Sequence, residues 1–239
     1  MRSTVRRMVR VQLRLAVAGA VVLAALTAAT TGASAATTRG RTGGETAPRT
    51  PVPGFLLDRG RFMRFDAPRA GIETAPNSID NLGRIVGSHV DDDADATYHG
   101  FLRDARGRFA TIDLPRAAGT SPVDINDRGQ ILGNYVDTAG GFHSFLLDRG
   151  RFTTIDAPGG AFTFARDINN RGQIAGFTLD DPVTLAGARG FLLAKGVGGP
   201  FTPVDVPGAP RNLVRGLNDR GQLVGSYENA NNGQQTPIR

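Results

Sequence analysis

From residue 54 to the end of the chain, short apolar runs alternate with polar turn sequences, and the alternation repeats four times. The runs have the length of ordinary β-strands, about four to seven residues, and none has a convincing helical period. Each repeat begins at a Phe-Leu box, and the boxes are 46, 44 and 46 residues apart, at Gly54, Gly100, Ser144 and Gly190. A period in this range is typical of solenoids, propellers and other repeat arrays.

Each repeat has two halves, and both place a turn sequence between apolar runs. The first half has the sequence F-L-L-D-R-G-R-F at Phe55–Phe62, and the second has I-N-D-R-G-Q-I at Ile125–Ile131. Asp or Asn followed two residues later by Gly predicts a hairpin, with a type I turn closed by a left-handed glycine in a G1 bulge. The glycines expected at positive φ are Gly60, Gly83, Gly129, Gly150, Gly172 and Gly221.

Two hairpins per repeat give four antiparallel strands, and four repeats give about sixteen. The sequence therefore predicts an all-β protein, a β-propeller built from four repeats of about 45 residues within residues 54–239. Five blades are the alternative, if the array is truncated or if another chain completes it.

The first 35 residues have the features of a secretory signal peptide. An acid-free basic start precedes a mostly apolar run, and Ala33-Ser34-Ala35 fits the small-residue cleavage rule. We expect cleavage after Ala35, with a retained anchor as the alternative and with both the Sec and twin-arginine routes open. Residues 36–53 are rich in Thr, Gly and Pro and are predicted to be a disordered linker.

Removal of that segment changes the charge of the protein. The whole chain has a formal charge of +6, and the five arginines of the segment account for most of it, leaving about +1. No Lys/Arg cluster recurs on one strand face, so neither nucleic acid nor, after cleavage, a membrane is an expected partner. The absence of cysteine excludes thiol catalysis and cysteine metal sites. A secreted, extracytoplasmic protein is predicted.

The boxes themselves resemble a known family. The sequences H-G-F-L at His99–Leu102 and H-S-F-L at His143–Leu146, with the four I-N-x-x-G-Q-I-x-G-like boxes, are similar to the HAF-repeat family of bacterial extracellular proteins. That family is named for a His-Ala-Phe triplet; here the middle residue is Gly or Ser, and Pro53 and Arg189 replace the His in the other two repeats. The resemblance covers residues 54–239, implies a secreted repeat protein and contributes no catalytic residues.

Several acidic residues and histidines are candidates for metal or catalytic sites. The D-x-P aspartates are interpreted as acceptors for local backbone N–H groups. Asp124 opens a calcium-like D-I-N-D-R-G sequence, but Arg128 stands where an oxygen ligand is needed. His99 and His143 occupy equivalent places, and a structural role at a strand start is favoured over a shared metal. We expect no metal, no cofactor and no catalytic residue. The D-x-P aspartates are Asp66, Asp113, Asp156 and Asp205.

In a meander, both Asx-x-Gly turns of a blade lie at one end and all the long loops lie at the other. The long loops differ in length and chemistry between repeats, so recognition is expected there. The sequence predicts a secreted, non-catalytic binding scaffold for a glycan or a protein; the alternative is an extracytoplasmic hydrolase or lyase using loop carboxylates and His. The predicted ligand-binding residues are Tyr98, His99, Phe142, His143, Phe162 and Phe164.

Overall fold

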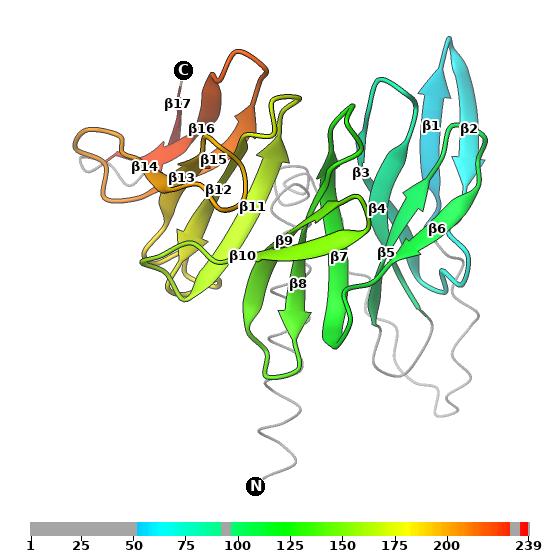
Figure 1. Ribbon diagram of the computed structural model, residues 1–239, viewed down its shortest axis with the longest axis horizontal. Helices are drawn as coiled ribbons and strands as arrows, with labels where there is room; N and C mark the ends of the chain where they lie inside the picture. Colours follow the sequence, from blue (N-terminus) through cyan, green and yellow to red (C-terminus); the bar gives the residue numbers. More distant parts are fainter. Residues whose placement is uncertain (1–51, 92–96, 230–234, 239) are drawn as a thin grey trace, which may run out of the picture. The chain divides into compact units, whose positions relative to one another are not determined.

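The computed structural model describes residues 52–91, 97–229 and 235–238, and the predicted signal segment 1–35 lies outside them. The described part of the chain is all-β, which confirms the predicted class (Figure 1). Its strands are β1 Gly54–Asp58, β2 Arg61–Phe65, β3 Glu73–Ile79, β4 Ile85–Val90, β5 Tyr98–Arg103, β6 Phe109–Ile112, β7 Ala117–Ile125, β8 Ile131–Asp137, β9 Phe142–Asp148, β10 Arg151–Ile155, β11 Phe162–Ile168, β12 Ile174–Leu179, β13 Arg189–Leu193, β14 Phe201–Val204, β15 Asn212–Leu217, β16 Leu223–Glu228 and β17 Gln235–Ile238.

These strands form small antiparallel sheets, each a meander. Three sheets have four strands, β3–β6, β7–β10 and β11–β14, while β1–β2 has two and β15–β17 has three. Each four-stranded sheet begins with the second hairpin of one repeat and ends with the Phe-Leu hairpin of the next. The sheets are therefore shifted by half a repeat relative to the sequence repeats that begin at the Phe-Leu boxes. The Phe-Leu hairpin of the first repeat therefore stands alone as β1–β2.

A glycine and a phenylalanine explain why the sheets divide in this way. In each four-stranded sheet the glycine of the I-x-G sequence lies opposite the Phe of the next Phe-Leu box, as Gly133 does opposite Phe145. A Cβ on Gly133 would lie 2.3 Å from the ring of Phe145 and 2.9 Å from the carbonyl oxygen of Ser121. Only glycine lets the aromatic ring and the neighbouring backbone approach so closely. The two halves of successive repeats are thus joined across β8 and β9.

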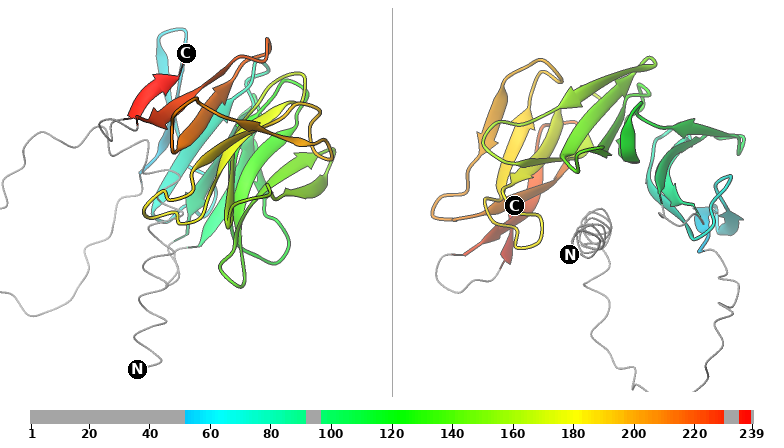
Figure 2. Two further views of the ribbon diagram at one scale, coloured as in Figure 1. Left: turned by 90° about the vertical axis from the view of Figure 1, so that its left-hand side faces the viewer. Right: turned by 90° about the horizontal axis from the view of Figure 1, so that it is seen from below.

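Consecutive sheets pack on one another in chain order (Figure 2). The first strand of each later sheet lies against the preceding sheet: β7 against β3–β5, β11 against β7–β9 and β15 against β11–β13. The largest core cluster lies between the second and third four-stranded sheets and includes Leu132, Ala165, Ile174 and Leu193, all almost fully buried. A second cluster joins the first two such sheets around Phe145. Burial of each large apolar side chain contributes about 1.5–3 kcal/mol, so the interfaces between sheets carry the stability.

The hairpin turns of the second halves agree with prediction, and those of the first halves agree only in part. In the second halves only the glycine has positive φ, as at Gly129, where the N–H bonds to the Asn126 carbonyl as a type I turn requires. The β5–β6 turn has the same form, closed by Gly107. In β1–β2 both central residues are left-handed, with φ of 47° at Arg59 and 80° at Gly60, and the β9–β10 turn is alike. These two turns are type I′, and the prediction of type I was wrong there. A two-residue hairpin loop prefers type I′ because its twist matches that of the strands.

The turns of the second halves also link one sheet to the next. The Asn126 carboxamide oxygen accepts the N–H groups of Arg128 and Gln130, and its Nδ2 donates to the Asn169 carbonyl of the following sheet at 3.0 Å. Asn169 makes the same bond to Asn218. This double use explains why an amide recurs before the turn: an Asn side chain both accepts within its turn and donates across the interface.

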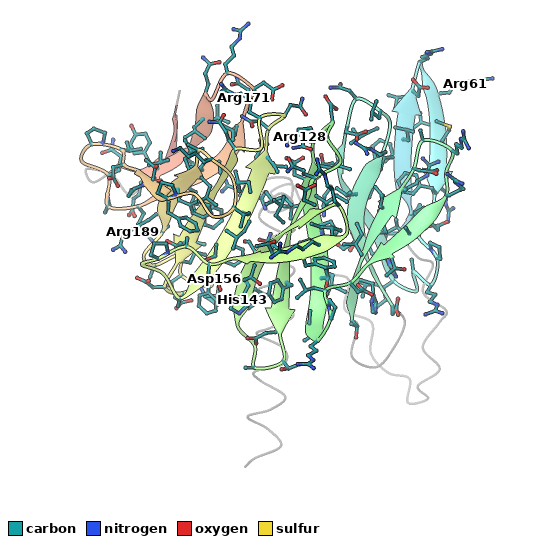
Figure 3. The ribbon with its side chains drawn as sticks, in the orientation of Figure 1. Arg61, Arg128, His143, Asp156, Arg171 and Arg189 are labelled. Atoms are coloured by element: carbon teal, nitrogen blue, oxygen red, sulfur yellow. The ribbon has the colours of Figure 1, made fainter. Side chains whose placement is uncertain are left out.

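Two ends of the molecule follow from the meander. We call the end that carries the tight turns, including β3–β4 and β5–β6, the turn end, and the end that carries the connections such as β4–β5 and β6–β7 the loop end. Figure 3 shows Arg61, Arg128 and Arg171 at the turn end and His143 with Asp156 at the opposite end. The predicted division into a turn side and a loop side is therefore confirmed.

Candidate functional site

At the loop end of the sheet β7–β10, a histidine is held between two carboxylates. His143, near the start of β9, places Nδ1 2.7 Å from Asp156 Oδ1 and Nε2 3.3 Å from Asp137 Oδ2. The ring of Tyr135 on β8 stacks on it, with centroids 5.0 Å apart and planes at 25°. Three separate segments thus fix the imidazole: β8, β9 and the residue that follows β10.

The sheet β3–β6 repeats this arrangement at the equivalent positions. His99 Nδ1 lies 2.9 Å from Asp113 Oδ2, and Nε2 lies 3.5 Å from Asp91 Oδ2. Here the stacking partner is the buried His89, with ring centroids 5.5 Å apart, and its Nε2 lies 3.3 Å from Asp91 Oδ1. Two neighbouring sheets therefore carry an Asp–His–Asp bracket, meaning a histidine whose two ring nitrogens both face carboxylates.

The surroundings shift the pKa values of these groups. Burial lowers the pKa of His143, but the hydrogen bonds and negative charges of Asp156 and Asp137 outweigh it, and the pKa lies above its ordinary value. The pKa of Asp137 is lowered, first by the backbone N–H of Gly141 and then by His143. At His89 burial dominates over Asp91 and lowers the pKa. The bracket thus favours the imidazolium form of His143 and the ionised form of Asp137.

The brackets correct the interpretation of two D-x-P aspartates. The sequence predicted that they accept from local backbone N–H groups, whereas Asp113 and Asp156 bond to His99 and His143 on the preceding strand. The antiparallel hairpin brings the two residues together, because Ser144 pairs with Ile155 and so places the His and Asp just beyond them. The sequence contained a signal for this pairing. Only in these two repeats does a His stand directly before the Phe-Leu box, and in both a D-x-P aspartate follows thirteen or fourteen residues later.

The predicted aromatic residues are placed differently from what their loop assignment implied. Tyr98, Phe142, Phe162 and Phe164 all lie in strands rather than in loops, because the strands extend further than the apolar runs indicated. Phe142 and Phe164 are buried, with their ring centroids 5.9 Å apart. Phe162 lies 5.6 Å from Phe142 and, like Tyr98, is half-buried. The structure groups the three phenylalanines between two sheets.

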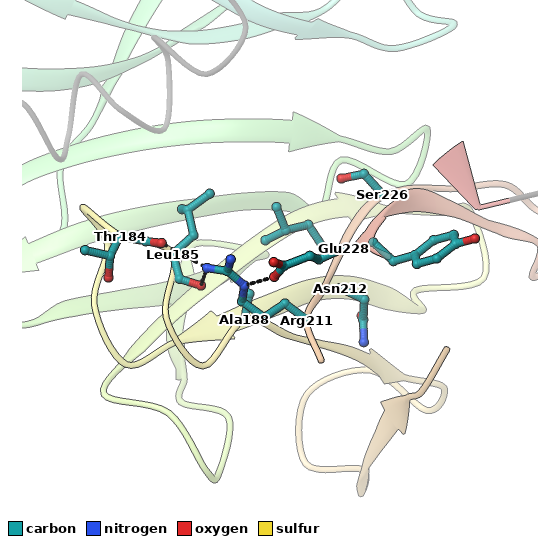
Figure 4. A pocket seen from close by; sticks show the side chains of 9 residues that line it. Thr184, Leu185, Ala188, Arg211, Asn212, Ser226 and Glu228 are labelled. Carbon is teal, nitrogen blue, oxygen red and sulfur yellow. Dashed lines mark hydrogen bonds and ion pairs between the residues drawn. The ribbon is translucent and has the colours of Figure 1, made fainter. Parts of the chain in front are cut away.

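A hollow that the sequence did not single out opens beside β15 and β16 (Figure 4). It measures about 400 Å³, including space open to solvent, and its walls include Leu185 and Tyr227. Arg211 donates from Nε to a Glu228 carboxylate oxygen and from a terminal nitrogen to the Thr184 carbonyl at 3.1 Å. Two long connections supply its lining, at 180–188 and just before β15. Their length in the sequence was the available signal.

Two aspartates outside the brackets, Asp124 on β7 and Asp167 on β11, lie on the first strands of their sheets. Asp124 accepts the Ile168 N–H at 2.8 Å, and Asp167 accepts the Leu217 N–H at 2.7 Å, so each carboxylate caps the backbone of the next sheet. Burial raises the pKa of Asp167 to about 7, and the neighbouring Asp124 adds to the rise. The nearby Arg166 has a lowered pKa, first through burial and then through Arg215. The two carboxylates therefore connect neighbouring sheets.

Within residues 52–91, 97–229 and 235–238, no three His, Asp or Glu side chains are placed to hold a metal ion together. The same part of the chain contains no helix that is long and apolar enough to span a membrane. A scan against protein-family models found no match, and a search of curated proteins found no similar sequence. The geometry of the loop end is therefore the basis on which a function is argued.

Proposed function

We propose that this protein is a secreted, non-catalytic repeat protein of the HAF-repeat type whose sheets are the blades of a β-propeller, and that its loop end binds an extracellular glycan. The repeated four-stranded meanders, each packed against the preceding one in chain order, support the propeller. The chain would leave the cytoplasm through its N-terminal signal segment. A protein partner is the other ligand class that the loop end could take.

One observation carries the proposal: two adjacent sheets present the same Asp–His–Asp bracket at the same end. The side chains of His99 and His143 are 31% and 27% exposed, so their edges reach solvent. Rings held on both nitrogens lose little conformational entropy when a ligand binds, which is how preorganisation raises affinity. Repetition in neighbouring sheets suits a ligand that also repeats, as the sugar units of a glycan do.

The bracket also favours binding over catalysis. A histidine that acts as general base must direct one ring nitrogen at the proton it removes. In His143 both nitrogens face carboxylates, at 2.7 Å and 3.3 Å, and neither faces a hydroxyl nucleophile. The remaining lone pairs of the carboxylate oxygens are acceptors that match the hydroxyl donors of a sugar. The ion pair of Arg211 and Glu228 adds polar groups of the same kind at the hollow.

The test is a glycan array probed with the full chain, run beside a panel of glycoside hydrolase and polysaccharide lyase substrates. We expect binding without turnover, and His143→Gln should weaken it at least about tenfold, because one ring of the bracket is lost. Arg149→Gln, at the turn end, is the matched control and should bind as the wild type does. Turnover that His143→Gln abolishes would instead support the hydrolase or lyase, and equal losses in both variants would refute a loop-end site.

A further inference from the structure

The first hairpin exposes side chains that its counterparts bury. Phe55 on β1 is 64% exposed and Phe62 on β2 is 74% exposed, although the two rings lie 5.7 Å apart. The residues equivalent to Phe55 are Phe101, Phe145 and Phe191, and all three are at most 4% exposed. The sequence of β1–β2 is thus that of an interior hairpin, but among the described residues no further strands cover it on one side.

The last sheet, β15–β17, is also incomplete and also exposes a residue that its equivalents bury. Val224 on β16 is 54% exposed, whereas its equivalents Val86, Leu132 and Ala175 are fully buried. The sheet β15–β17 contains the first two strands of a four-stranded sheet, followed by β17 in the third position, where Ile238 lies opposite Gly225. The hairpin β1–β2 consists of the third and fourth strands of such a sheet. Together the two partial sheets contain the parts of one complete sheet.

The glycine–phenylalanine pairs specify how the parts would join. In every four-stranded sheet the I-x-G glycine pairs with a Phe-Leu box phenylalanine: Gly87 with Phe101, Gly133 with Phe145 and Gly176 with Phe191. Phe55 has no such glycine, and Gly225 has no such phenylalanine. The same register places Phe55 opposite Gly225 and Leu56 opposite Val224.

The turn end carries an independent sign of continuation. Asn81, Asp127, Asn170 and Asp219 form a chain of hydrogen bonds in which amides and carboxylates alternate from sheet to sheet. Each interior member is bonded on both sides, whereas Asn81 bonds only forward to Asp127 and Asp219 only backward to Asn170 among the described residues. If the chain is extended, Asp219 meets Asn81, and the alternation continues without placing like groups side by side.

We propose that β1–β2 of one copy of this chain completes the sheet begun by β15–β16 of a second copy, taking the position of β17. The occupant is a second copy because β1–β2 and β15–β17 lie at opposite ends of the row of sheets within one chain (Figures 1 and 2, right). The contact is head-to-tail, and two such contacts close a ring of two copies. Closure pairs the open edge of β1, and β1 replaces β17 as the neighbour of β16. The inference does not depend on the identity of the loop-end ligand.

Disulfide cross-linking tests the register, since the chain has no cysteine of its own. Leu56→Cys and Val224→Cys are introduced into separate full-length chains, which are then mixed and oxidised. We expect a covalent heterodimer on a non-reducing gel, because a cysteine pair directly opposite across antiparallel strands can be bridged. Leu57→Cys mixed with Val224→Cys is the control: adjacent residues point to opposite faces of a strand, and little cross-linking should form.

The outcomes divide clearly. Cross-linking of the mixed pair, with the Leu57 control unlinked, supports the proposal. Equal cross-linking of both pairs overturns the register. A double variant carrying Leu56→Cys and Val224→Cys gives the remaining outcome. If the mixed single variants do not link and the double variant forms a disulfide within one chain, the sheet closes within one copy and the proposal is wrong.

A second measurement avoids engineered bonds. The full chain should sediment at twice its mass of 25.2 kDa, and Phe55→Asp or Val224→Asp should convert it to a monomer. Both side chains are exposed in the single copy, so these variants should fold. Val183→Asp is the matched control, since Val183 is 67% exposed but lies in the connection between β12 and β13. A wild-type monomer, or a Val183 variant that dissociates equally, overturns the proposal.

Discussion

The substitution Asp167→Asn should stabilise the protein at neutral pH and have little effect in acid. The carboxyl group is partly buried beside Asp124, and its pKa is raised from 3.8 to about 7. An acid with a raised folded-state pKa holds its proton in the native state after the unfolded chain has released it. Wild-type stability therefore falls as pH rises from about 4 to about 7, and then levels off. Asparagine keeps an oxygen acceptor for the Leu217 N–H without this ionisation.

The magnitude follows from the shift. About three pKa units at 1.36 kcal/mol each set an upper bound of about 4 kcal/mol. Asp167 remains partly exposed, and solvent screening reduces the effect, so we expect about 2 kcal/mol. The positive charge of the neighbouring Arg166 also reduces the rise in the pKa of Asp167, because it favours the ionised carboxylate.

Urea denaturation of the wild type and of Asp167→Asn at about pH 4 and about pH 8 measures the difference in unfolding free energy. Asp127→Asn is the control with the opposite sign. Hydrogen bonds from Asn81 lower the pKa of Asp127, so its carboxylate stabilises the fold above the unfolded pKa and loses that effect as pH falls. If Asp167→Asn gains no stability at pH 8 relative to pH 4, the pKa of Asp167 is not raised in the folded protein and the reasoning is refuted.

Two further predictions concern the close packing and the bracket. Gly133→Ala should cost about 1–3 kcal/mol in the unfolding free energy, because its Cβ would overlap Phe145, whereas a Cβ on Gly119 meets only ordinary contacts and Gly119→Ala should be nearly neutral. His143→Gln should lower the unfolding free energy more at about pH 6 than at about pH 9. The raised pKa of His143 stabilises the fold at pH values below the unfolded-state pKa, and this contribution is lost as the pH rises through the folded-state pKa. A loss of stability that does not depend on pH would mean that the charge of His143 does not matter.

The hairpins were predictable because their determinants are local. Asp or Asn followed by Gly fixes a turn over four or five residues, and the period of the Phe-Leu boxes sets the strand number. The spacing alone did not predict which two hairpins share a sheet. A sheet of β1–β2 with β3–β4 would have the same period as the observed sheet of β3–β4 with β5–β6. The choice is decided by non-local fit: the ring of Phe145 needs the space over Gly133, and that requirement appears only when β8 and β9 lie side by side.

The loop end was predicted as a region but not in its chemistry. All six predicted ligand residues lie at or near strand ends, and two phenylalanines are buried because they fill the gap between sheets. The partners of His99 and His143 were missed because a carboxylate thirteen or fourteen residues away is distant in sequence but directly across a hairpin. The hollow beside Arg211 depends on connections of irregular conformation, which residue patterns do not specify.

Departures from the repeat are informative when they are read together with their neighbours. In the first repeat Asp80 replaces the turn asparagine and loses its amide donor, yet Arg84 replaces the glutamine, pairs with the buried Asp80 carboxylate and donates to the carbonyls of Asn126 and Asp127. The double change preserves the link between sheets, so it reflects a structural requirement met by other atoms. Arg189, where two other repeats have a bracketed histidine, has no such compensation: its guanidinium donates to the Gly159 carbonyl instead. Uncompensated departures of this kind occur at the loop end, which is where selection on a ligand, rather than on the fold, would act.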